Sequence, residues 1–98
     1  MRHDVVSIGE VLIDLTQTGR AGGIPQYAAN PGGAPANAAV AAARMGCRTA
    51  FIGRVGDDAF GALLRNTLAG DGIDLAGLST DPAIPTTLAV VSVGEGGE

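Results

Sequence analysis

Aromatic residues and cysteines are scarce in this sequence, and each scarcity limits what the chain can be. It contains no Trp, one Tyr and two Phe, so its apolar side chains are mostly Ala, Val, Leu and Ile. Small apolar side chains bury little area each, and a core built from them is expected to need more chain to close it. The single cysteine, Cys47, excludes a disulfide within the chain and fits a reducing compartment.

Basic side chains and long apolar runs are also few. Six Lys and Arg residues stand against ten Asp and Glu, which gives a formal charge of −4 and an isoelectric point near 4.7. This balance argues against nucleic acid and against an anionic membrane as partners. The apolar run at residues 38–43 is far too short to span a membrane, and no signal peptide pattern is present. We therefore expect a soluble, cytoplasmic protein.

The order of periodic segments predicts an α/β fold. Strands are expected at residues 4–8, 11–18, 26–30, 49–55 and 86–93, and helices at about 35–45 and 57–70. Asp57 is the expected N-cap of the second helix, and Gly46 is expected just past the end of the first. Residues 19–25 and 73–85 are expected to be loops, and residues 94–98 a hairpin turn. Such alternation predicts a sheet with right-handed crossovers, and a turn as the last element indicates a fragment.

The segment around residues 30–37 carries the clearest chemical signal. Gly32 and Gly33 stand directly before the first expected helix, where glycine lets the backbone approach a ligand and present its N–H groups. The helix start adds unpaired donors and a partial positive potential. Asn37 lies in the first turn, and its amide can both donate and accept hydrogen bonds. The pattern suits a polyhydroxy ligand, but a plain turn before a helix has the same composition.

The sequence resembles the PfkB, or ribokinase-like, carbohydrate kinases along its whole length. The first signature of that family is matched by residues 32–37 (GGAPAN), followed by Ala39, Gly46 and Gly56. Its N-terminal strand and turn look like residues 7–14 (SIGEVLID), and the stretch after the signature resembles residues 54–61 (RVGDDAFG). Within the family, these forms look most like bacterial fructokinases.

The resemblance implies a ribokinase-like fold: a Rossmann-like layered α/β sheet with a small β-sheet lid, incomplete in this chain. Residues 1–98 would be the N-terminal part of one kinase domain, with lid strands at about 11–31 and 86–93. The family's nucleotide-binding part, aspartate base and Gly-rich anion hole lie later in the sequence. No GxxxxGK[ST] phosphate loop is present either. The complete protein is thus expected to be a sugar kinase, and this chain alone to be inactive.

The resemblance also implies roles for single residues. Asp14 would accept hydrogen bonds from sugar hydroxyls, Gly33 with Gly32 beside it would present backbone to the sugar, and Asn37 would bind another hydroxyl. An Asp inside an otherwise apolar strand is costly to bury unpaired, which favours a ligand nearby, although a surface Asp on an edge strand is the alternative. Leu12 stands where ribokinases proper tend to carry Asn, which argues against ribose.

The resemblance implies further partners for the complete enzyme. These are ATP, Mg²⁺ and a small-molecule sugar, and a homodimer through the lid is possible. No catalytic residue, metal ligand or nucleotide-binding residue is expected in this chain. Asp57 and Asp58 together resemble a metal-binding pair, but helix capping explains them better.

Other functions stay open. A nucleoside kinase or a 2-keto-3-deoxygluconate kinase would share the fold, and a non-catalytic remnant would share the sequence. A dinucleotide-binding domain is disfavoured, because Gly9-Glu10-Val11 after the first strand lacks the GxGxxG turn.

Overall fold

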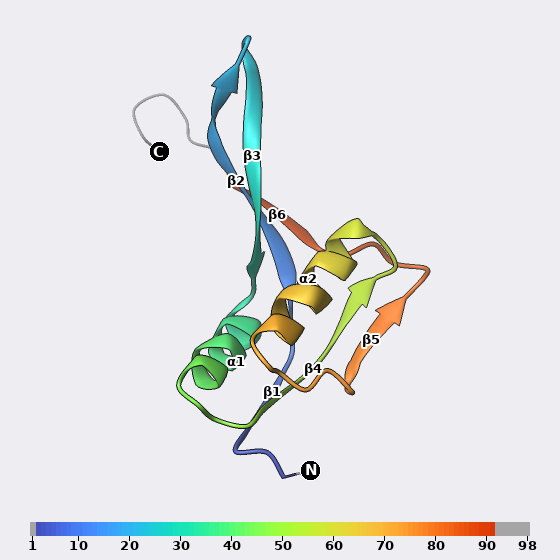
Figure 1. Ribbon diagram of the computed structural model, residues 1–98. Coiled ribbons are helices and arrows are strands. Elements are labelled where there is room, and N and C mark those ends of the chain that lie inside the picture. Colours follow the sequence, from blue (N-terminus) through green and yellow to red (C-terminus); the bar gives the residue numbers. More distant parts are fainter. Residues whose placement is uncertain (1, 92–98) are drawn as a thin grey trace.

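The computed structural model describes residues 2–91, which form two three-stranded sheets and two helices (Figure 1). In chain order the elements are β1 (Val5–Ile8), β2 (Leu12–Ala21), β3 (Ile24–Gly32), α1 (Ala34–Arg44), β4 (Thr49–Gly56), α2 (Ala59–Gly70), β5 (Leu78–Asp81) and β6 (Leu88–Val91). The longest of these helices has 12 residues, and no helix within residues 2–91 is long and apolar enough to cross a membrane.

One layer is a parallel sheet in the order β1-β4-β5, and both helices contribute to the core on one of its faces. Phe51 and Val55 of β4 point into this core, where Leu64 and Leu68 of α2 join them. Phe51, Leu64 and Leu68 are completely shielded from solvent. Each such side chain contributes about 1.5–3 kcal/mol when fully buried. Helix α1 adds the buried alanines Ala36 and Ala39, and its Val40 packs against the edge of the core.

The other face of the parallel sheet is open. Successive side chains of a strand point to opposite faces, and the neighbours of the core residues are therefore exposed. Ile8 and Ile52 pair across β1 and β4 and are 69% and 41% exposed, and Val6 lies beside them at 49%. Among the described residues, only one face of this sheet is thus covered.

The second sheet has the order β3-β2-β6 and projects away from the parallel sheet (Figure 1). Strands β2 and β3 form a long antiparallel hairpin, and β6 pairs with β2 in parallel. This sheet reaches the core through Ile13, which is completely buried, and Leu15 and Ala29 pack against the edge of the core. The projecting hairpin makes the molecule elongated: its Cα radius of gyration is 15.1 Å, against about 13 Å for a compact domain of this size.

The structure corrects the predicted loop at residues 19–25. Strand β2 continues to Ala21, and β3 starts at Ile24 and runs to Gly32, well beyond the predicted strand at 26–30. Gly22 and Gly23, with φ of +59° and +80°, make a two-residue turn between them. Two successive positive φ angles are what a tight hairpin turn requires, so the glycines close a hairpin here and do not form a loop.

Two more predictions near α2 need correction. The N-cap of α2 is Asp58 and not Asp57, because Asp58 has the extended backbone and its side chain accepts a hydrogen bond from the Gly61 N–H at 2.7 Å. The predicted loop at 73–85 contains a strand, β5, which four residues form beside β4. A run this short gives little periodic signal.

The remaining elements lie close to their predicted positions. Gly46 follows the last residues of α1 with φ of +92°, as expected of a glycine past a helix end. Strand β6 covers Leu88–Val91 of the predicted 86–93. Residues 92–93 and the hairpin turn predicted at 94–98 lie outside the described residues.

Candidate functional site

The β2–β3 pairing places the Asp14 carboxylate against Gly32. In this register Asp14 lies opposite Asn30 and Leu12 lies opposite Gly32. A Cβ atom placed on Gly32 would lie 2.8 Å from Cγ of Asp14 and 3.0 Å from Cδ1 of Leu12. Any side chain at Gly32 would therefore displace the carboxylate. The absence of a side chain there leaves the carboxylate room beside the backbone.

Gly33 forms the corner between β3 and α1. Its φ of +99° is strained for any residue with a side chain, and a Cβ atom there would lie 2.7 Å from the carbonyl oxygen of Glu10. Glu10 belongs to the connection between β1 and β2. The corner is thus the place where the backbones entering β2 and leaving β3 meet, directly at the start of α1.

Helix α1 begins without a side-chain cap. Its N-cap is Gly33, which has no side chain, and no described side chain hydrogen-bonds to the first turn. The Gly33 carbonyl accepts the Asn37 backbone N–H at 2.9 Å, which closes that turn. Of the earlier positions, Ala34 and Ala36 keep their N–H groups as donors and Pro35 has none. The helix start adds a partial positive charge. The Asn37 side chain is exposed beside them.

The Asp14 carboxylate also has free acceptors. It is half-buried, and within residues 2–91 no side chain forms an ion pair or hydrogen bond with it. Each ionised carboxylate offers about four acceptor positions. Acceptors on Asp14 and donors at the start of α1 therefore lie on the two sides of the Gly32–Gly33 corner. That combination suits hydroxyl groups, which both donate and accept.

The structure thus brings the four predicted binding residues into one segment of the fold. Asp14 lies against Gly32, Gly33 follows in the chain, and Asn37 is linked to Gly33 through the first turn of α1. Their placement is a fact of the structure, while their binding of a sugar remains a prediction.

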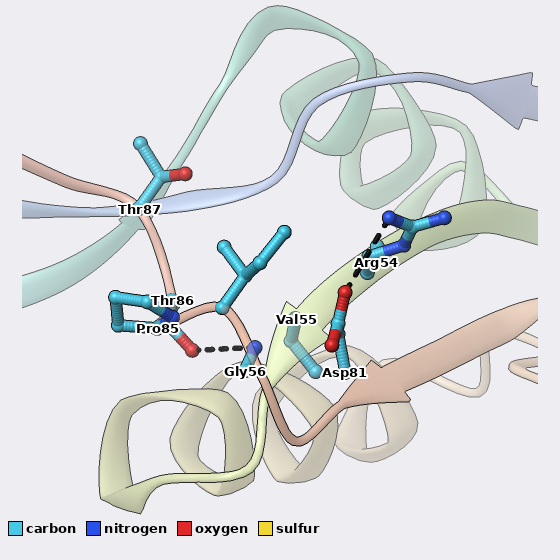
Figure 2. Close-up of a pocket in the computed structure, with 8 residues that line it drawn as sticks. Arg54, Val55, Gly56, Asp81, Pro85, Thr86 and Thr87 are labelled. Carbon is cyan, nitrogen blue, oxygen red and sulfur yellow. Dashed lines mark hydrogen bonds and ion pairs between the residues drawn. The ribbon is translucent and has the colours of Figure 1, made fainter.

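A hollow of about 210 Å³ lies at the ends of β4 and β5 (Figure 2). The segment before β6 closes one side of it, and an Arg54–Asp81 ion pair at 3.5 Å crosses another. Arg54 is exposed, so this pair contributes little to stability. This hollow could not be predicted from the sequence, because its walls come from three separate segments.

Beside the hollow, the Asp58 side chain joins two distant parts of the chain. Its Oδ1 accepts hydrogen bonds from the Gly61 N–H and the Thr86 hydroxyl, both at 2.7 Å, and its Oδ2 accepts the Thr86 N–H at 2.9 Å. The Thr86 hydroxyl oxygen in turn accepts the Gly56 N–H at 2.9 Å (Figure 2). These bonds, first of all the one from the Thr86 N–H, lower the pKa of Asp58 below its ordinary value.

Sequence reasoning found only part of this arrangement. An Asp directly before an apolar helical stripe is a helix-start signal, which the Asp57–Asp58 pair leaves ambiguous by one position. Nothing local indicates the partner Thr86, 28 residues further on. Of the acidic pair, Asp58 caps α2, and Asp57 is exposed. No group of three or more potential metal ligands occurs within residues 2–91.

Comparison with known proteins agrees with the fold and the motifs. Residues 2–98 match the pfkB family of carbohydrate kinases, and the chain belongs to that family. Fructokinase-1 of Oryza sativa subsp. japonica is 43% identical over 97 residues, which are 96% of this chain and 30% of the rice protein.

Solved fructokinases match the structure as well. The fructokinase from Xylella fastidiosa superposes with a TM-score of 0.89 at 35% identity, over 96% of this chain and 30% of that one. The apo fructokinase from Vibrio cholerae O395 gives 0.87 at 42% identity, over 96% and 31%. The ribokinase-like α/β fold is therefore confirmed. The chain spans about a third of the length of these relatives.

Proposed function

We propose that this chain is the sugar-binding part of an ATP-dependent sugar kinase that transfers a phosphoryl group to a hydroxyl of fructose or a similar sugar. The observation that carries the proposal is the pairing of the free Asp14 carboxylate with the uncapped start of α1 across the Gly32–Gly33 corner. The fructokinase relatives support the choice of substrate, and the fructokinase of Vibrio cholerae O395 has been solved with fructose and ADP bound.

The residues of this chain would bind and orient the sugar. Asp14 would accept hydrogen bonds from two neighbouring hydroxyls, and the first-turn N–H groups of α1 would donate to sugar oxygens. The Asn37 amide would reach a further hydroxyl. Holding the acceptor hydroxyl in place matters because phosphoryl transfer depends mainly on positioning and on charge stabilisation.

The β3-β2-β6 sheet would act as a lid over the sugar. Strands β2, β3 and β6 project beyond the core (Figure 1). Asp14 directly follows Ile13, whose buried side chain joins this sheet to the core. A sheet that folds down over the sugar would exclude water, which otherwise competes as phosphoryl acceptor. We place the protein in the cytoplasm, where a cysteine remains reduced and ATP is supplied.

ATP and Mg²⁺ would be held by other parts of the complete enzyme. The described residues contain no cluster of three metal-ligating side chains, and the start of α2 is already occupied by Asp58. When bound, Mg²⁺ and ATP supply the phosphoryl group and neutralise its charge. This chain alone is therefore expected to bind sugar and to transfer no phosphate.

The decisive test is a kinase assay on the complete product of the reading frame that encodes this chain. ATP would be offered with fructose, ribose, 2-keto-3-deoxygluconate and a nucleoside such as aminoimidazole riboside, whose kinase from Salmonella enterica shares the fold at a TM-score of 0.81. Fructose should give the highest kcat/KM. Turnover of the nucleoside alone would replace this proposal with a nucleoside kinase, and no phosphorylation of any acceptor would refute it.

We also propose that the β3-β2-β6 sheet pairs with the same sheet of a second copy of the protein. The β6 strand at its edge exposes Leu88, Val90 and Val91 at 43%, 61% and 49%. Exposed apolar edge strands favour pairing with another chain. Light scattering on the complete product should give a dimer, and Val90→Lys should shift it toward monomer. A monomer at all concentrations would exclude this interface.

A further inference from the structure

We infer that Asp58 is a positioning residue for the sugar site: through Thr86 it fixes the root of β6, and with it the β2 strand that carries Asp14, against the start of α2. The hydrogen-bond part of this inference stands on the geometry alone, whereas its consequence for sugar rests on the proposed function.

Several hydrogen bonds hold the junction between Asp58 and Thr86 together. One carboxylate accepts three hydrogen bonds, two of them from Thr86, and Thr86 also accepts one from the backbone of Gly56. Thr86 is only 6% exposed, so its polar groups depend on these partners. Hydrogen bonds to an ionised group are about twice as strong as neutral ones. The junction is therefore strong and fully paired, far more than a helix cap alone requires.

At this junction the backbones of β4, α2 and the segment before β6 approach one another closely. A Cβ atom on Gly56 would lie 2.8 Å from the carbonyl oxygen of Ile84, and one on Gly61 would lie 3.1 Å from Oγ1 of Thr86. The segment that enters β6 thus lies directly on the end of β4 and on the first turn of α2. Only glycine fits at these two positions, which leaves this segment little freedom to shift.

A backbone hydrogen bond connects the junction to the candidate sugar site. Directly after Thr86, the carbonyl oxygen of Thr87 accepts the backbone N–H of Ile13 at 3.0 Å. From there β6 runs parallel to β2, with Asp14 opposite Ala89. Asp14 is therefore next in the chain to a backbone group that the junction holds in place. Four residues, Asp58, Thr86, Thr87 and Ile13, form a continuous path between α2 and the carboxylate.

A helix cap without a positioning role is the competing interpretation, and the two differ in how far an Asp58 substitution acts. In Asp58→Asn the remaining oxygen still accepts the Gly61 N–H, but the new amide opposes the Thr86 N–H. If Asp58 acted only as a cap, exchange would then change little, and at most in the first turn of α2. A positioning residue would also release the Ile13 amide and the amides of β6, on another sheet.

Hydrogen exchange followed by mass spectrometry or NMR on the complete product tests this. We expect Asp58→Asn to speed exchange about tenfold or more at Ile13 and in β6, as the loss of a bond to a charged group would do. The interior of α2, at Leu64 and Leu68, should stay protected. Asp57→Asn is the matched control, because Asp57 is exposed and within residues 2–91 its side chain forms no hydrogen bond, and it should leave all of these amides unchanged.

Two variants of the partner residue make the test independent of how well Asp58→Asn folds. Thr86→Val keeps the shape and removes the hydroxyl, so it should reproduce the faster exchange at Ile13. Thr86→Ser keeps the hydroxyl and should restore it toward the original rate. Equal exchange at Ile13 in the Val and Ser variants, or faster exchange confined to the first turn of α2, would overturn the inference.

Kinetics gives the functional readout. We expect Asp58→Asn to raise the KM for fructose about fivefold to tenfold while the KM for ATP stays constant, since the sugar site alone is displaced. If fructose is not a substrate at all, the proposed function fails, but the exchange results still decide whether Asp58 holds β6. If fructose is a substrate and its KM is unaffected, the positioning role is refuted.

Discussion

The two helices of this chain begin in opposite ways. Helix α2 starts at Asp58, whose carboxylate satisfies the first turn and binds Thr86 as well. Helix α1 starts at Gly33, which has no side chain to offer, and its first turn has no side-chain cap. A helix start needs partners for its unpaired N–H groups. At α2 the protein supplies them itself, and at α1 it leaves them for something else.

The contrast separates structure from function within two similar motifs. Both helices follow a glycine-containing turn at the end of a strand, so composition alone does not distinguish them. At α2 the glycines allow close packing of three backbone segments. At α1 they hold a bare corner beside the Asp14 carboxylate, which has no side-chain partner among residues 2–91. An open helix start next to a free acceptor is the arrangement that a ligand with hydroxyl groups would complete.

The largest effect is expected from adding a methyl group at the closed start. Gly61→Ala would force its Cβ into the Gly56 carbonyl oxygen, and we expect a loss of about 1–3 kcal/mol in the free energy of unfolding. Gly70→Ala, at the other end of the same helix, meets nothing within 4 Å and should gain about 0.5–1 kcal/mol. Urea unfolding of both variants measures the difference. Equal stabilities would contradict the close packing at α2.

At the open start, substitution should affect binding and spare stability. Asp14→Asn keeps the size of the side chain but removes its charge and half of its acceptors. We expect the KM for fructose to rise about 10–100-fold, as for the loss of hydrogen bonds to a charged group, with the urea midpoint unchanged. An unchanged KM would show that the carboxylate does not contact the sugar.

The closed start should also respond to acid. The Thr86 N–H, the Thr86 hydroxyl and the Gly61 N–H hold the pKa of Asp58 below its ordinary value of 3.8. A lowered pKa means that Asp58 adds stability above about pH 4, and that this part is lost as the pH falls through the folded value. The melting temperature should therefore drop below pH 4, and less steeply in Asp58→Asn than in Asp57→Asn.

That acid limb should not vanish completely in Asp58→Asn. The pKa of Asp4 is lowered by hydrogen bonds from Arg48, and that of Asp74 by the Ala76 N–H and by His3. These groups keep part of the slope. Identical melting curves for the Asp58 and Asp57 variants from pH 2.5 to 7 would mean that the Asp58 bonds do not form in solution.

The smallest effect is expected at Asn37. Its side chain is exposed, so Asn37→Ala should change the free energy of unfolding by no more than about 0.5 kcal/mol. One neutral hydrogen bond to a sugar hydroxyl contributes about 0.5–1.5 kcal/mol, and the KM for fructose should rise about twofold to tenfold. Isothermal titration measures the affinity for fructose, and urea unfolding of the same sample measures the free energy of unfolding. A loss of stability without a loss of affinity would make Asn37 a structural residue.

The difference between the two starts also explains how far sequence reasoning reached. Gly33 and Asn37 lie within five residues of each other, and the resemblance to the family predicts them as binding residues together with Asp14. Their local pattern could be interpreted without knowing any long-range contact. The bond between Asp58 and Thr86 could not, because it spans 28 residues and a threonine before a strand is common.

The errors in the fold have similar physical causes. The Gly22–Gly23 pair was read as part of a loop, since glycine content alone does not reveal that both residues take positive φ in a hairpin. Strand β5 was missed because it has four residues, of which two are exposed, and its pairing with β4 depends on tertiary structure. Longer elements with a clear apolar period, such as α2 and β4, were predicted within two residues of their ends.

The most direct test of the central claim is a fructose titration of the isotopically labelled complete product, followed by NMR. We predict that the amide signals of Asp14, Gly33 and Asn37 shift together with one dissociation constant. The signals of Arg54 and Asp81, at the hollow beside the ends of β4 and β5, should stay in place. Shifts confined to the hollow at the ends of β4 and β5, with the signals of the Gly33 corner unaffected, would contradict the account.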